Sequence, residues 1–108
     1  MLKIYDVAQE VVRRLVPIVA ELERKDPDLA TQLKRARSSI TLNIGEGSHA
    51  QGKRRNQHYG YAKGSAQESI AILETAVSAE YIKAVPRDLI EMLRRIVGTL
   101  YNCIGRRH

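Results

Sequence analysis

One stretch of the chain has much of the pattern of a phosphate-binding loop. Gly47 to Lys53 fits the first seven positions of G-x-x-x-x-G-K-[ST], in which backbone N–H groups surround a nucleotide phosphate. The eighth position is Arg54, which has no hydroxyl to hold magnesium, and the segment follows a helical pattern where the motif requires a strand. We therefore do not expect nucleotide hydrolysis from this loop.

Other groups that support catalysis or metal binding in proteins are scattered. His49, His58 and His108 have neither the spacing nor the cysteine and carboxylate neighbours of a metal site. No serine has the surroundings of a nucleophile elbow, and Glu46 and Glu68 would serve as acid and base only inside a pocket. We expect a protein that is not an enzyme and that uses no metal or cofactor.

Positive charge is concentrated in residues 34–63. The chain has a formal net charge of +6, and this segment holds seven lysines and arginines against Glu46 alone, which also nets +6. Such a concentration favours a face that binds a polyanion, although a basic surface without a dedicated ligand is the alternative. The residues that we predict to contact phosphates and bases are Lys34, Arg35, Arg37, Lys53, Arg54, Arg55, His58 and Tyr61.

Hydrophobic spacing predicts four helices and no strand, in a single domain over residues 1–108. Apolar residues recur three and four positions apart, with helices expected over about 4–22, 29–44, 53–81 and 86–104. Pro17 should kink the first helix near Arg13. Gly45, Gly47 and Gly52 should end or loosen the second helix. The short breaks favour an all-α, antiparallel up-down-up-down four-helix bundle.

Two helices have more apolar surface than one bundle needs. Val12 and Val16 widen the apolar side of the first helix to nearly half of its circumference. The third helix has a second stripe, opposite the main one, that needs a partner of its own: Tyr61, Ser65, Ile72, Ala76 and Ala79. A chain of 108 residues also leaves much surface unburied, so self-association is expected.

Small polar residues are placed at the edge of the predicted interface between the second and third helices. Ser39 and Asn43 lie one turn apart, and Ser65 and Glu68 face them from the next helix, where Gly64 should allow close backbone approach. We interpret the set as a structural and assembly motif of hydrogen-bonded groups, with direct ligand contact as the alternative. Its members are Ser39, Asn43, Glu46, Gly47, Gly64, Ser65 and Glu68.

The same residues resemble the signatures of a known family. S-I-T-L-N-I-G-E-G at Ser39 to Gly47 is similar to the S-I-x-x-N-I-A-E-G signature of the four-helix bundle proteins encoded in intervening sequences of 23S ribosomal RNA genes. A-K-G-S-A-Q-E-S at Ala62 to Ser69 is similar to the family's A-x-G-S-x-x-E segment. The chain departs from the family pattern at Gly45, where alanine is usual, and in having tyrosines before Ala62 where the family favours phenylalanine.

The resemblance implies an antiparallel bundle that assembles into a homo-oligomeric ring, usually a pentamer. A related branch, the accessory proteins of diversity-generating retroelements, binds a reverse transcriptase and nucleic acid. Together with the charge, this favours a nucleic-acid-binding accessory protein, with RNA ahead of DNA. A protein-interaction adaptor is the alternative. No membrane span or signal peptide is evident and the chain has one cysteine, so we expect a cytoplasmic protein.

Overall fold

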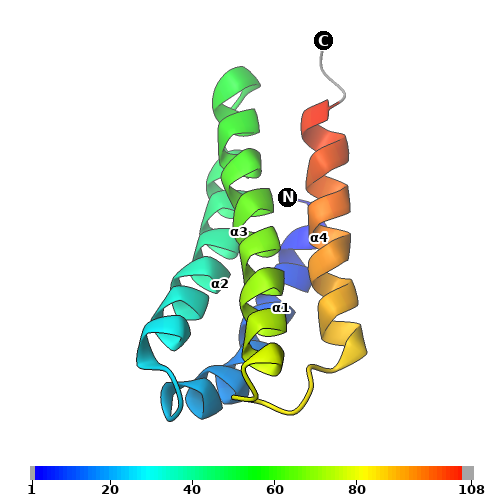
Figure 1. Ribbon diagram of the computed structural model, residues 1–108. Helices are drawn as coiled ribbons and strands as arrows, with labels where there is room; N and C mark the ends of the chain where they lie inside the picture. Colours follow the sequence, from blue (N-terminus) through cyan, green and yellow to red (C-terminus); the bar gives the residue numbers. More distant parts are fainter. Residues whose placement is uncertain (1, 106–108) are drawn as a thin grey trace.

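The computed structural model describes residues 2–105, and among them it contains four α-helices and no strand (Figure 1). The helices are α1 (Ile4–Glu23), α2 (Pro27–Ser48), α3 (Gly52–Ser78) and α4 (Arg87–Gly105). Each packs against the next along the chain, and α1 also packs against α4. The four helices thus form the expected antiparallel bundle, which measures 43 × 21 × 21 Å.

The core follows the predicted periodicity. Leucine, isoleucine, valine and alanine side chains from all four helices meet along the bundle axis, and the largest fully buried ones include Leu15, Leu33, Ile40, Leu73 and Leu93. Burial of such side chains contributes about 1.5–3 kcal/mol each. None of the described helices is long and apolar enough to cross a membrane.

The prediction that α3 has a second stripe in need of a separate partner is wrong. Ile72 and Ala76 are buried together with the main apolar face, while Tyr61 and Ala79 are exposed. The reason is that α3 packs against both α2 and α4, so one broad face is covered from two sides. On α1, by contrast, the side chain of Val16 is 54% exposed. Among the described residues, no other helix covers this part of α1.

Helix α2 begins two residues before the expected start at about residue 29 and ends at Ser48, four residues after the expected end. The Asp26 carboxylate caps it by accepting a hydrogen bond from the Leu29 N–H at 3.0 Å, and Pro27 occupies the first turn. The helix ends at Ser48, within the segment 45–52 that contains the three glycines, but Gly45 and Gly47 lie inside the helix and do not end it. Gly47 is required by packing instead, since a Cβ there would lie 2.6 Å from Tyr59 Cδ1.

Helix α3 ends at Ser78, three residues before the predicted Tyr81. Glu80 adopts a left-handed conformation with φ of 64°, and the Tyr81 N–H donates to the Ala76 carbonyl at 2.9 Å while the Glu80 N–H donates to Val77. This is a Schellman motif with a non-glycine residue at its left-handed position. The sequence therefore carries no glycine to signal the end of the helix.

Candidate nucleic-acid interface at the start of α3

Three cations stand in the first turn of α3. Lys53, Arg54 and Arg55 are all exposed, and this turn contains no acidic residue. The helix also begins without a side-chain cap, from Gln51, and Gly52 has a positive φ of 59°. Free N–H groups and the positive end of the helix dipole thus add to the side-chain charge. The arrangement attracts anions.

The basic residues predicted on α2 belong to a different region. Arg35 precedes the end of α2 at Ser48 by 13 residues, which is about 20 Å along the helix. Lys34 forms an ion pair with Glu23 at 3.1 Å, and Arg37 is half-buried, with its Nη1 atom buried and without a hydrogen-bond partner. The structure therefore does not bring the two predicted clusters together.

A chain of hydrogen bonds connects α2 with α3 beside the basic turn. Ser65 Oγ donates to Ser39 Oγ at 2.8 Å. The Asn43 amide nitrogen donates to the Ser39 carbonyl at 2.9 Å and contacts Ser39 Oγ at 3.0 Å. The Asn43 amide oxygen lies 3.0 Å from Nδ1 of His58. These four partly buried residues hold one face of the α2–α3 pair in register.

The network also determines the tautomer of His58. Because the Asn43 nitrogen is used as a donor to Ser39, its oxygen faces the imidazole, and an amide oxygen only accepts. Nδ1 must therefore carry the proton. The other ring nitrogen, Nε2, lies 3.8 Å from the Glu46 carboxylate, and the His58 side chain is 19% exposed.

The remaining members of the predicted motif take less part in these contacts. Glu46 and Glu68 are exposed. Gly64 is also exposed, and a Cβ added there would meet nothing within 4 Å. The expectation that Gly64 allows close backbone approach is therefore wrong within this chain. Gly47 has that role, because the ring of Tyr59 lies against it.

Two tyrosines follow the basic turn along α3 and have different environments. Tyr59 is buried, and desolvation raises the pKa of its hydroxyl, so the ring serves as a packing surface. Tyr61 is 55% exposed, and its hydroxyl accepts a hydrogen bond from the Gln57 amide at 3.0 Å. Its ring is nearly perpendicular to the imidazole of His58, and the two ring centroids are 6.5 Å apart. Tyr61 lies six residues after Arg55, about 9 Å further along α3, and an exposed ring at this distance from the cations is suited to base stacking.

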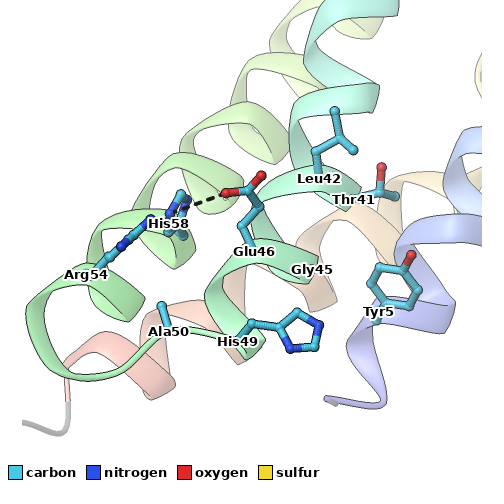
Figure 2. A pocket seen from close by; sticks show the side chains of 9 residues that line it. All are labelled: Tyr5, Thr41, Leu42, Gly45, Glu46, His49, Ala50, Arg54 and His58. Carbon is cyan, nitrogen blue, oxygen red and sulfur yellow. Dashed lines mark ion pairs between the residues drawn. The ribbon is translucent and has the colours of Figure 1, made fainter.

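A cleft opens between the end of α2, the start of α3 and the first turns of α1. Figure 2 shows Glu46, His58 and Arg54 on one side of it and the rings of Tyr5 and His49 on the other. Thr41, Leu42, Gly45 and Ala50 complete the lining. Within residues 2–105 no three His, Cys, Asp or Glu side chains are grouped to hold a metal ion; His108 lies outside the described residues.

Sequence reasoning did not find the part of the cleft that comes from α1. Tyr5 precedes Gly45 by forty positions, yet a Cβ on Gly45 would lie 3.8 Å from its ring. The pairing of α1 with α2 creates this contact. Gly45 does not signal this contact, because a Cβ there would lie at an ordinary van der Waals distance from the Tyr5 ring.

Comparison with known proteins gives two matches. A family model described as 23S rRNA-intervening sequence protein matches residues 1–102. The chain is also similar to a crystal structure of a protein of unknown function from the S23 ribosomal protein family of Bacteroides thetaiotaomicron, with a TM-score of 0.80 and 24% sequence identity. That match covers 94% of this chain and 97% of the other, and it supports the fold alone. No curated protein matches the chain.

Proposed function

The chain belongs to the family of 23S rRNA-intervening sequence proteins, and on this premise we propose that it is a non-enzymatic, RNA-binding accessory protein of the cytoplasm. The main support is the exposed turn of Lys53, Arg54 and Arg55 at the positive end of α3. Cations in this position attract phosphates, and exposed Tyr61, less than two turns further along α3, offers a ring for a base. RNA is favoured over DNA because of the family.

We further propose that the protein acts as a homo-oligomer, with a pentameric ring as the form implied by the family resemblance. The exposed Val16 on α1 supports this, since the apolar side of that helix is wider than its intramolecular contacts. Repetition of the basic turn around a ring would multiply the phosphate contacts. Light scattering on the purified protein measures the mass as a multiple of 12.2 kDa, and a monomer at all concentrations contradicts the proposal.

The test of RNA binding is a titration of labelled single-stranded RNA and DNA at several salt concentrations. In the variant K53E/R54E/R55E we expect affinity at low salt to fall at least about tenfold. The slope of log affinity against log salt should decrease in magnitude by about two per subunit if each of the three cations contacts one phosphate of the single strand. Tighter binding of RNA than of matched DNA is expected.

A second triple variant controls for the overall charge. R87E/R94E/R95E reverses three exposed cations on α4 and, like the first variant, lowers the formal net charge from +6 by 6 to 0. It should bind RNA much more tightly than K53E/R54E/R55E. Equal losses in the two variants would show that net charge alone determines binding, and the absence of RNA binding in the unmodified protein would refute the proposed function.

A protein adaptor is the second candidate, and exposed apolar side chains favour it. Leu42 is 65% exposed on α2, and Tyr61 is 55% exposed on α3. Apolar residues on a polar surface mark many protein interfaces. This reading predicts that a protein partner, such as a reverse transcriptase, binds after nuclease treatment and is lost on Leu42→Ser substitution.

A further inference from the structure

The carboxylate of Glu46 is unexpected in this part of the chain. It is the only acidic side chain in residues 34–63, and it lines the same cleft as Arg54 and His58. Its nearest recorded contact, His58 Nε2 at 3.8 Å, is longer than a hydrogen bond, and the side chain is 65% exposed. Both carboxylate oxygens therefore retain acceptor capacity. A negative charge weakens phosphate binding, so phosphate contact does not explain it.

The two acceptor oxygens of the Glu46 carboxylate limit which base can form hydrogen bonds in the cleft. Single-stranded RNA is read by hydrogen bonds to the Watson–Crick edges of unstacked bases. An ionised carboxylate only accepts hydrogen bonds, and it accepts two side by side. Among the four bases, only guanine has two adjacent donors on this edge, N1–H and the 2-amino group. Adenine, cytosine and uracil each place an acceptor next to their donor, and that acceptor would face the carboxylate.

We propose that this cleft binds a guanine base of single-stranded RNA, with Glu46 accepting from N1–H and the 2-amino group. The inference rests on the proposed RNA-binding function and adds base specificity to it. Arg54 lies one turn before His58 on α3 and lines the same side of the cleft, so its guanidinium is placed to donate to guanine O6 or to the adjoining phosphate (Figure 2).

The surroundings of Glu46 are arranged for such a contact. The hydrogen bond from His58 Nδ1 to Asn43 holds the imidazole in place beside the carboxylate. On the other side of the cleft, the rings of Tyr5 and His49 offer faces against which a base can stack (Figure 2). The volume of about 510 Å³ falls within the range of small-ligand sites.

The test compares uridine hexamers that carry a single guanine, adenine or inosine at the third position. The unmodified protein should bind the guanine hexamer about tenfold or more tightly than the adenine hexamer. Inosine lacks the 2-amino group and should have intermediate affinity. In Glu46→Gln, one acceptor becomes a donor, so the preference for guanine should disappear while binding of the adenine hexamer stays equal or improves.

Glu68→Gln is the matched control, because Glu68 is also exposed and does not line the cleft. It should retain the preference for guanine. Equal binding of all hexamers by the unmodified protein, or an unchanged preference in Glu46→Gln, would overturn the inference and leave the RNA-binding function intact. Guanosine monophosphate provides an independent probe, because it should shift the His58 imidazole resonances more than adenosine monophosphate does. If the protein shows this difference but binds none of the RNA hexamers, the guanine site is supported and the proposed RNA-binding function is refuted.

Discussion

The first turns of α3 and α4 use charge in opposite ways. At the start of α4, Asp88 complements the positive end of the helix dipole and forms two hydrogen bonds of 3.0 Å with Arg14 of α1. At the start of α3, Lys53, Arg54 and Arg55 oppose the dipole. The first turn of every other helix contains an aspartate. The charges at the start of α4 thus favour its helix, whereas those at the start of α3 oppose theirs, as expected if this turn is the proposed phosphate-binding site.

The largest effect is expected from reversing the charges of α3. K53E/R54E/R55E should be more stable than the unmodified protein by about 1–3 kcal/mol at low salt, because each acid at a helix start contributes about 0.3–1 kcal/mol. The same variant should lose RNA affinity. Urea denaturation followed by circular dichroism, at one fixed protein concentration, measures the stability. If K53E/R54E/R55E were less stable than the unmodified protein, the cations at the start of α3 would not be unfavourable for the helix, and the contrast with the start of α4 would not hold.

Substitutions at the residues that precede α2 and α3 should change the free energy of unfolding in opposite directions. Asp26→Ala removes the bond to the Leu29 N–H and should lower the free energy of unfolding by about 1 kcal/mol. Gln51 is extended at the start of α3 and makes no capping bond, so Gln51→Asp should raise this free energy by up to about 1 kcal/mol. Thermal unfolding of both variants compares them directly, and destabilisation by Gln51→Asp would show that α3 tolerates no acid at its start.

The smallest effect concerns the ion pair at the start of α4. The hydrogen bond from Arg14 lowers the pKa of Asp88 below its ordinary value of 3.8. A lowered pKa in the folded state means that the pair stabilises the protein above about pH 4 and that this contribution is lost as the pH falls through the lowered pKa. Asp88→Asn should therefore be slightly less stable than the unmodified protein at pH 7.

At pH 2.5 the difference between Asp88→Asn and the unmodified protein should shrink. Asp6→Asn is the control, since Asp6 is exposed in the first turn of α1 and forms no ion pair among the described residues. Denaturation midpoints measured at both pH values compare the two variants. A pH-independent difference for Asp88→Asn would show that the Arg14–Asp88 contact does not contribute through its charge.

Much of the bundle was predictable, because its determinants lie close together in the chain. The three- and four-residue spacing of apolar residues predicts all four helices and most of the core. The expected start of the second helix at about residue 29 lies within two residues of the actual start of α2 at Pro27. The family, too, was identified from short motifs, and the match over residues 1–102 confirms it. In each case the information is local.

The errors occurred where a distant residue decides the local outcome. The ring of Tyr59 makes Gly47 a packing position inside α2, where the sequence indicated a helix end. Glu80 ends α3 in a conformation that glycine usually adopts. The basic residues of α2 and α3 belong to one segment of the sequence, but Arg35 lies about 20 Å along α2 from the end of that helix and so is away from the basic turn.

Side-chain type and spacing are enough to establish the helical periodicity, the family and the local excess of cations. Which of these cations share a surface, and which residues lie next to them, depends on how the helices pack. This packing brought Tyr5 of α1 to the cleft and placed Glu46 next to His58, whose orientation depends on a bond to Asn43 from another helix. Such contacts arise when helices pack, and no local pattern encodes them.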